Sequence, residues 1–449
     1  MELSPEQEQA MMAFTEKKNL FLTGPGGTGK TALIKKMVDF CKTTGRKVQV
    51  CALTGCAAVI LNCQAKTVHS WSGIGIANGS VEYIMRKVYA NKYKSSQWKK
   101  IDVLIIDEVS MMSQKIFEVL DSIGRKVRPA MAHLPFGGLQ LVFSGDFYQL
   151  PPVMRDEDKE SEPTAAAFCF ESPLWPTTFH TVVQLKKIFR QTDQAYTAIL
   201  NQIRIGKLYK SSLDKLAPHI GKTLPENFAP TILLPRRRDA ELVNAAELKK
   251  LEGEEHVYKI SSAADMLESA ASQKTKGQKE APIKEKITPE QKEIETQYLI
   301  NSIMADKEIV LKKGAQVMCI VNLDMESPEP IVNGSQGIVI DFVGGLPLIQ
   351  FNNGARQTVG YHVWTSEYHQ TIGVQQLPLI YAWAITIHKA QGVSLDMAQI
   401  DAGSNIFECG QTYVALSRVK SLDGLYLTAF NPQKIKVNRK VQEFYAALL

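Results

Sequence analysis

The sequence lacks long hydrophobic runs and is poor in cysteine. No apolar stretch in its 449 residues approaches the roughly 20 residues that a membrane-spanning helix requires. The polar start, Met1-Glu2-Leu3-Ser4, does not resemble a secretory signal. The seven cysteines are odd in number and include no C-x-x-C pair, so neither a disulfide framework nor a zinc site is expected. These absences predict a soluble, intracellular protein with no membrane partner, in a compartment that the sequence does not identify.

The sequence also lacks a strong charge bias and any internal repeat. Its net charge at neutral pH is +6, which permits a polyanionic partner without demonstrating one. No segment recurs at the spacing of solenoid repeats. The length suffices for about two to four domains with sizeable cores.

What the chain does contain is a glycine-rich loop in the right setting for phosphates. Residues 24–31 read GPGGTGKT and fit G-x-x-x-x-G-K-[ST], whose backbone N–H groups cradle nucleotide phosphates. The apolar run before the loop predicts a buried strand, and apolar residues at helical spacing after it predict a helix. Lys30 is expected to reach the β- and γ-phosphates, and Thr31 to hold Mg²⁺. The loop therefore predicts a bound nucleotide with Mg²⁺.

Two carboxylates follow another apolar strand. Residues 103–106 are apolar and lead directly into Asp107 and Glu108. Adjacent carboxylates at the tip of an apolar strand are costly unless a cation or a function compensates. Asp107 is expected to hold Mg²⁺ and Glu108 to polarise the attacking water, so the pair favours hydrolysis over binding alone.

Further residues are candidates for the nucleotide site. Gln149 follows a strand predicted over residues 139–143, where its carboxamide can sense the γ-phosphate. Arg190 and Arg418 are candidate arginine fingers, although a lone arginine near a helix start is also common as a surface cap. Gln7 has two interpretations, because it completes a capping box at a helix start and also has the chemistry to read an adenine edge.

Two segments allow both a structural and a nucleic-acid interpretation. Residues 67–71 read TVHSW, and their hydroxyls and histidine suit contact with a single-stranded backbone, whereas a lone histidine is also common in a structural position. Residues 73–100 look irregular, with Tyr93 and Trp98 among lysines. These rings could stack on bases, or Trp98 could pack under the next strand.

Strand and helix signals alternate over the first part of the chain, which predicts a parallel α/β nucleotide-binding core. A second core is expected from strands at 231–234 and 379–385 and from the helix that carries Arg418. Residues 261–286 are polar and free of aromatics, as in a mobile insertion or linker. Short β-branched runs with turn signals over 309–351 predict a small β-barrel-like module inserted in the second core.

Taken together, these motifs resemble those of a superfamily 1B DNA helicase of the Pif (petite integration frequency) family. The resemblance extends from Leu3 to Leu427. The matching segments are Gln7, the phosphate loop, 52–55 (ALTG), 67–71 (TVHSW), 106–111 (IDEVSM), 145–153 (GDFYQLPPV), 189–191 (FRQ) and Arg418. Residues 135–141 (PFGGLQL) resemble the end of the family signature, and residues 311–318 and 332–335 resemble its SH3-like insertion. No segment is assigned as a strand-separating wedge.

The resemblance implies an α/β protein of two RecA-like P-loop NTPase lobes, with a small accessory region in lobe one and an SH3-like β-barrel insertion in lobe two. The expected domains are 1A at 1–180, with accessory region 1B at about 73–98, and 2A at 181–250 and 375–449. Domain 2B is expected at 251–374, with the SH3-like module at about 309–360 and the polar insertion at about 261–286.

The resemblance also implies the cofactors ATP and Mg²⁺, partners in single-stranded and forked or structured DNA, and a monomer. Implied catalytic residues are Lys30, Glu108, Gln149, Arg190 and Arg418. Implied ATP contacts are Gln7, Gly24, Gly26, Gly27, Thr28, Gly29, Lys30, Thr31, Gln149, Arg190, Gly392 and Arg418. Implied Mg²⁺ contacts are Thr31 and Asp107, and implied contacts with single-stranded DNA are Thr54, Gly55, His69, Ser70, Asn333, Thr386, His388 and Lys389.

The implied activity is that of an ATP-dependent 5′–3′ DNA helicase that translocates on single-stranded DNA and unwinds duplex or structured DNA. Forks, G-quadruplexes, DNA–RNA hybrids and protein roadblocks all stay open as substrates. Two alternatives stand beside it. One is a P-loop ATPase that remodels protein or protein–DNA complexes without strand separation, and the other is a nucleotide-gated DNA-binding module that unwinds nothing.

Overall fold

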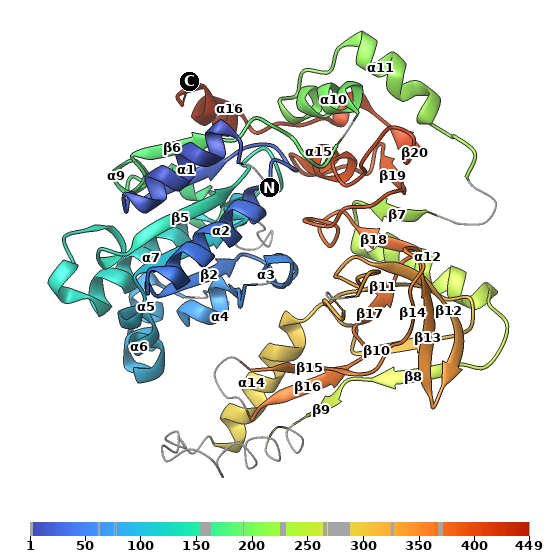
Figure 1. Ribbon diagram of the computed structural model, residues 1–449, viewed down its shortest axis with the longest axis horizontal. Helices are drawn as coiled ribbons and strands as arrows, with labels where there is room; N and C mark the ends of the chain where they lie inside the picture. The colour runs from blue at the N-terminus through green and yellow to red at the C-terminus, as the bar shows by residue number, and fades with distance from the viewer. Residues whose placement is uncertain are drawn as a thin grey trace. The chain divides into compact units, whose positions relative to one another are not determined.

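The computed structural model describes residues 3–61, 63–75, 77, 79–152, 163–191, 193–224, 230–263, 267, 288–324, 327–366 and 371–448. The chain forms two compact units, one made of Met1–Arg236 with Thr386–Leu449 and the other of Arg237–Ile385. Both are drawn in Figure 1. Among the described residues, no helix is long and apolar enough to cross a membrane.

A parallel sheet of six strands forms the centre of the first part of the chain, in the order β3-β2-β4-β5-β1-β6 (Figure 1). Every residue of β1, β4 and β5 is buried, as expected for a parallel sheet covered on both faces. The prediction of a parallel α/β core is therefore confirmed. The strands are β1 (Leu20–Thr23), β2 (Val48–Ala52), β3 (Lys66–Thr67), β4 (Val103–Asp107), β5 (Gln140–Gly145) and β6 (Thr181–Gln184).

Helices cover this sheet through side chains that alternate between its faces. On β4, Val103 and Ile105 belong to one apolar cluster with residues of α2, whereas Leu104 and Ile106 belong to another with residues of α7. The helices of this region are α1 (Pro5–Thr15), α2 (Lys30–Thr43), α3 (Gly55–Leu61), α4 (Val68–Ser72), α5 (Val81–Ala90), α6 (Lys92–Lys100), α7 (Gln114–Val127), α8 (Pro163–Ala166) and α9 (Trp175–Thr178).

The irregular segment expected over 73–100 is instead largely helical, since α5 and α6 occupy most of it. The many lysines of this segment make its short apolar stripe difficult to recognise in the sequence. In that stripe, Ile84 and Val88 of α5 are buried one helical turn apart. Trp98 is fully buried, lies 4.7 Å from the Trp71 ring and donates its indole N–H to the Ser72 carbonyl at 3.2 Å. The packing interpretation of Trp98 is therefore confirmed.

A second sheet has the order β18-β7-β19-β20, and β7, β19 and β20, which all belong to the first unit, are parallel neighbours. Its strands are β7 (Thr231–Leu234), β18 (Ala384–Thr386), β19 (Ala398–Ala402) and β20 (Leu425–Phe430). The helices that follow the first sheet are α10 (Gln194–Arg204), α11 (Lys210–Leu216), α15 (Gln411–Leu416) and the C-terminal α16 (Arg439–Ala446). Phe444 on α16 packs against Phe21 of β1 and Trp175 of α9, so α16 lies against the first sheet (Figure 1).

The second unit is rich in antiparallel strands. One sheet has the order β14-β13-β12-β11-β17, and smaller sheets are β10-β8 and β15-β16-β9. A glycine pair, Gly344 and Gly345, turns β12 into β13 with φ of +60° and +77°, a conformation that favours glycine. The elements are β8 (His256–Lys259), β9 (Ser261–Ser262), β10 (Glu308–Leu311), β11 (Gln316–Cys319), β12 (Gln336–Val343), β13 (Leu346–Phe351), β14 (Arg356–Thr358), β15 (His362–Thr365), β16 (Gly373–Gln376), β17 (Leu379–Tyr381), α12 (Arg237–Lys250) and α14 (Pro289–Ser302).

Two expected positions in the fold are wrong. The first sheet does not end at residue 180, because β6 at 181–184 pairs with β1. Residues 379–381 do not belong to the second parallel core, because β17 pairs antiparallel with β11. A short apolar run does not encode its partner strand, which explains both errors. The polar insertion at 261–286 lies largely outside the described residues, and closure of the β-rich part as an SH3-like barrel stays a prediction.

Candidate active site

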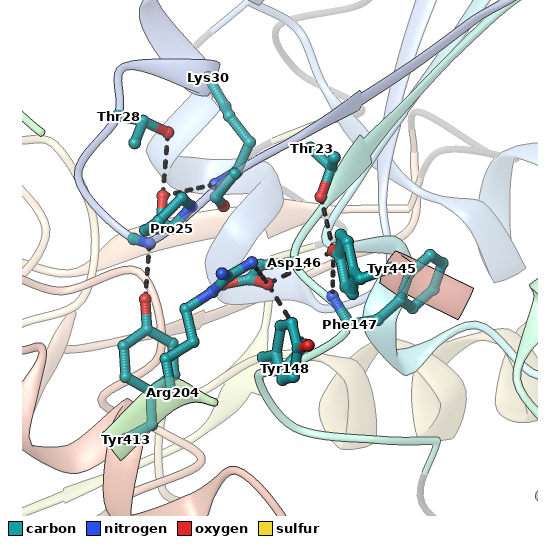
Figure 2. Close-up of polar contacts among 12 residues, drawn as sticks. Thr23, Pro25, Thr28, Lys30, Asp146, Phe147, Tyr148, Arg204, Tyr413 and Tyr445 are labelled. Carbon is teal, nitrogen blue, oxygen red and sulfur yellow. Dashed lines mark hydrogen bonds and ion pairs between the residues drawn. The ribbon is translucent and has the colours of Figure 1, made fainter. Parts of the chain in front are cut away.

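The phosphate loop leaves the end of β1 and enters α2 at Lys30, as predicted. Gly24, Gly27 and Gly29 have φ of +144°, +81° and +80°. At Gly27 a Cβ atom would stand 2.6 Å from the Cβ of Arg190, so the loop requires glycine there both for its conformation and for its close neighbour. Lys30 Nζ donates to the carbonyls of Gly24 and Pro25 at 2.7 and 3.0 Å (Figure 2). The ammonium group therefore lies over the loop that is expected to hold phosphates.

The two carboxylates stand at the carboxyl end of β4, which β5 separates from β1 in the sheet. Asp107 is the last residue of β4 and is buried, and Glu108 follows in a left-handed conformation with φ of +56°. Such strain in a non-glycine residue is concentrated at functional sites. Burial raises the pKa of Asp107, and burial followed by the charge of Asp107 raises the pKa of Glu108, while Lys30 opposes both shifts. Burial also lowers the pKa of Lys30.

Both candidate arginine fingers meet at the phosphate loop. A Cβ atom on Gly26 would lie 3.8 Å from Nη1 of Arg190 and 3.8 Å from Nη2 of Arg418. Arg190 donates to the Ser417 carbonyl at 3.2 Å, and buried Arg418 donates from Nε to the Val414 carbonyl at 2.9 Å. Arg190 does not cap α10, whose N-cap is Asp193, so its interpretation as a surface cap is wrong.

Gln149 lies buried in the turn after β5, where its backbone N–H donates to the Asp146 carbonyl at 2.9 Å. Its own carbonyl would be 2.5 Å from a Cβ atom on Gly410, the N-cap of α15. This contact brings the segment after β5 against the helix that precedes Arg418. Gly392 has a φ of +83° in the turn after β18.

Gln391 is a residue that the sequence reasoning missed. Its side-chain amide donates to Oε2 of Glu108 at 3.0 Å, so the turn after β18 touches the carboxylate expected to polarise water. The signal in the sequence is an amide residue beside Gly392 that closely follows three expected DNA contacts.

The capping interpretation of Gln7 is confirmed. Its Oε1 accepts the Ser4 N–H at 3.0 Å, and its backbone N–H donates to Oγ of Ser4 at 3.4 Å. The same side chain donates from Nε2 to the Thr28 carbonyl at 3.3 Å, which links α1 to the phosphate loop. A Cβ atom on Gly29 would lie 2.8 Å from Nε2 of Gln7 and 3.6 Å from the Phe189 ring, so both side chains flank the start of α2. An adenine contact of Gln7 stays a prediction.

Four of the expected DNA contacts follow adjacent strands of the first sheet. Thr54 and Gly55 follow β2, and His69 and Ser70 follow β3, and the two strands pair in parallel with Ala52 opposite Thr67. These four residues therefore stand at the same edge of the sheet. Burial lowers the pKa of His69, which favours its neutral form.

A buried lysine supports the helix that carries His69 and Ser70. Lys94 on α6 donates from Nζ to the carbonyls of Ser70 and Trp71, at 2.8 and 3.4 Å. Of three further expected contacts, Thr386 is the last residue of β18, and His388 and Lys389 lie in the turn after it together with Gln391. Asn333 belongs to the other unit, where its backbone N–H donates to Oδ1 of Asn322 at 2.9 Å.

Comparison with known proteins assigns these features to a family. The family model for PIF1-like helicases matches residues 2–212, and that for the 2B domain of the DNA helicase Pif1 matches residues 298–342. The crystal structure of Pif1 helicase from Candida albicans is 33% identical, with 100% of both chains covered and a TM-score of 0.79. The chain belongs to the PIF1-like helicase family. The resemblance inferred from the sequence motifs is thereby confirmed.

Two other PIF1-like proteins bear on this chain. The ATP-dependent DNA helicase PIF1 of Xenopus laevis is 34% identical over 99% of this chain, which spans 64% of the relative's length. A Bacteroides Pif1 helicase, solved in complex with ADP-AlF3 and ssDNA, is 29% identical with a TM-score of 0.68, and the match covers 100% of this chain and 97% of that one.

Residues 135–141, which resemble the end of the family signature, make several polar contacts within the first unit. The backbone N–H of Phe136 donates to Oδ1 of Asp121 at 2.8 Å, and Arg128 Nε donates to the Gly137 carbonyl at 2.8 Å. Gln140 donates from Nε2 to the Phe14 carbonyl at 2.9 Å. The segment thus links α7, β5 and α1 by polar contacts, of which those of Phe136 and Gln140 are buried.

Proposed function

We propose that this chain is an ATP-dependent DNA helicase that moves 5′–3′ along single-stranded DNA and separates paired or structured strands. The observation that carries the proposal is the convergence on one phosphate loop of Lys30, the Asp107–Glu108 pair and the two arginines, drawn from segments far apart in the sequence. A loop that only bound a nucleotide would need neither a carboxylate held on the strained backbone of Glu108 nor two converging guanidinium groups.

The residues present suit ATP and Mg²⁺. Phosphate oxygens would accept hydrogen bonds from the backbone N–H groups at the start of α2 and from the ammonium group of Lys30. Oxygen donors are those that Mg²⁺ prefers, and Thr31 with Asp107 would supply them. When bound, the ion supplies charge that offsets the cost of burying Asp107. Glu108 would take the proton of the attacking water, and Arg190 and Arg418 would stabilise charge on the transferred phosphoryl group.

Coupling to DNA is proposed through the segments that follow β2 and β3, where α3 and α4 begin, and through the turn after β18. The turn contacts Glu108 through Gln391, so DNA bound by His388 and Lys389 would influence the position of the Glu108 carboxylate. The Bacteroides relative in complex with ADP-AlF3 and ssDNA supports both ligand classes. The 5′–3′ polarity rests on the resemblance to the family alone.

The proposed organisation is two RecA-like lobes around the two parallel sheets, with the antiparallel sheet of the second unit as the SH3-like insertion. A monomer is proposed because Lys30, Glu108, Arg190 and Arg418 all come from one chain, so no second copy is needed for ATP turnover. Because its substrate is DNA, we place the protein inside the cell.

The test combines ATP turnover with strand displacement. We expect single-stranded DNA to stimulate hydrolysis and a forked duplex to be separated only with ATP and Mg²⁺. Hydrolysis that ignores DNA would favour a protein-remodelling ATPase, and stimulated hydrolysis without displacement would favour a DNA-binding module gated by nucleotide. The matched control is Lys30→Ala, which removes the ammonium group at the phosphate loop and should abolish both activities.

A further inference from the structure

A buried polar cluster joins the base of the phosphate loop to the segment that carries Gln149. Its centre is the hydroxyl of Tyr445, on the C-terminal helix α16 (Figure 2). This oxygen lies 2.6 Å from Oγ1 of Thr23, accepts the backbone N–H of Phe147 at 3.2 Å and donates to Oδ1 of Asp146 at 3.4 Å. A tyrosine hydroxyl has one proton and two lone pairs, so these three partners use its full capacity, with Thr23 as the second donor.

The partners of this hydroxyl stand where two neighbouring strands part. β1 and β5 pair in parallel, and the ladder between them ends with Thr23 opposite Gly145. Beyond that pair, one backbone turns into the phosphate loop at Gly24 and the other into the turn that leads to Gln149. Tyr445 therefore ties the two segments together just past the last ladder pair.

The same cluster extends to α10. Asp146 forms a buried ion pair with Arg204, the last residue of this helix, through contacts of 2.8 Å (Nε to Oδ2) and 2.7 Å (Nη2 to Oδ1). The guanidinium lies 4.4 Å from the ring centre of Tyr148 and 5.4 Å from that of Tyr445, and the two rings are stacked 4.8 Å apart. Burial opposes the charge of Arg204, but Asp146 raises the pKa of Arg204 above the usual value, so the guanidinium keeps its charge.

We propose that Tyr445 is a positioning residue for ATP hydrolysis, whose hydroxyl fixes the phosphate loop relative to Gln149. The inference rests on the proposed ATPase function. Without the hydroxyl, the buried Thr23 side chain and the buried Phe147 N–H lose this partner, and both segments gain freedom to shift. Phe147 lies two residues before Gln149, so such a shift moves the expected γ-phosphate sensor directly.

The variant Tyr445→Phe removes the hydroxyl and keeps the ring stacked on Tyr148. We expect the kcat for DNA-stimulated ATP hydrolysis to fall about tenfold, because misplacement of a reacting group by a fraction of an ångström is costly. The KM for ATP should stay within about twofold, since the contacts of the loop with its ligand are kept. The matched control is Tyr258→Phe in the second unit, a buried tyrosine whose hydroxyl donates to the Gly345 carbonyl at 2.8 Å. It should leave kcat unchanged.

A second variant removes the other partner of the hydrogen bond between Tyr445 and Thr23. Thr23→Val removes the other hydroxyl at nearly constant volume, and its effect on kcat should not add to that of Tyr445→Phe, because both delete one contact. An unchanged kcat with a lowered melting temperature would overturn the inference, since the hydroxyl would then act only on stability. A raised KM at constant kcat, or additive effects, would also overturn it. Wild-type protein without ATP turnover would instead refute the proposed function and this inference with it.

Discussion

Removal of either member of the ion pair between Asp146 and Arg204 should strongly destabilise the first unit. Their side chains are 0% and 7% exposed, and two charge-assisted hydrogen bonds join them. We consider Arg204→Met, which keeps most of the side-chain length and removes the charge, and Asp146→Asn, which neutralises the partner. Each single change leaves one member of the pair buried without its counter-charge.

The magnitude follows from that burial. Removing one partner of a buried ion pair costs about 3–5 kcal/mol, because the remaining charge keeps its desolvation penalty and loses its compensation. In the double variant neither charge remains, so its cost should fall well below the sum of the two single costs. The interaction energy from the double-mutant cycle should be about 2–3 kcal/mol, the upper part of the range for contacting residues.

Urea unfolding followed by tryptophan fluorescence provides the assay. Trp71, Trp98 and Trp175 are all buried in the first unit, so their emission should change as that unit unfolds. If each single variant lowers the free energy of unfolding by less than about 1 kcal/mol, the reasoning is refuted, because an exposed ion pair contributes no more than that to stability. Costs that add in the double variant would refute it as well, because the two residues would then act independently.

Three further outcomes are expected. Lys30→Ala should abolish ATP turnover while DNA binding, measured by fluorescence anisotropy, is largely kept; loss of both would contradict its placement over the phosphates. Gln391→Ala should lower the ratio of DNA-stimulated to unstimulated turnover about tenfold, by cutting the contact between the turn after β18 and Glu108, and an unchanged ratio would count against that coupling. Burial lowers the pKa of His69 and of His388 below their usual value of 6.5, so at acidic pH the unfolded chain binds protons more readily than the folded chain. The free energy of unfolding should therefore be highest above pH 6.5 and should decrease as the pH falls below it. Urea midpoints at about pH 7.5 and pH 5.5 test this, and the double variant His69→Gln/His388→Gln should flatten the difference.

The nucleotide site was largely predictable because its motifs are local. Residues 24–31 fix a loop by glycine conformation and a lysine, and Asp107 with Glu108 stands out because paired carboxylates rarely end an apolar strand. Both motifs also require parallel strands whose carboxyl ends meet, which the alternating pattern supplied. The elements that position them were thus encoded within short windows of sequence.

Contacts between distant segments were not predictable in the same way. Tyr445 looks like an ordinary aromatic residue of a terminal amphipathic helix, and nothing near it in sequence indicates Thr23 or Phe147 as partners. Gln391 likewise carries no local sign that it reaches Glu108. The apolar strand at 379–381 was assigned to the wrong sheet for the same reason, since strand pairing depends on tertiary contacts. Helix α6 was missed because its lysine-rich surface masks the few buried residues that hold it.

The most direct measurement is strand displacement from two duplexes that differ only in whether the single-stranded tail is 5′ or 3′. Wild-type protein should release the labelled strand from the 5′-tailed duplex alone, and only with hydrolysable ATP and Mg²⁺. The variant Glu108→Gln should bind both substrates and release neither. Displacement from the 3′-tailed duplex would contradict the proposed polarity, and ATP hydrolysis without displacement from either would contradict the helicase itself.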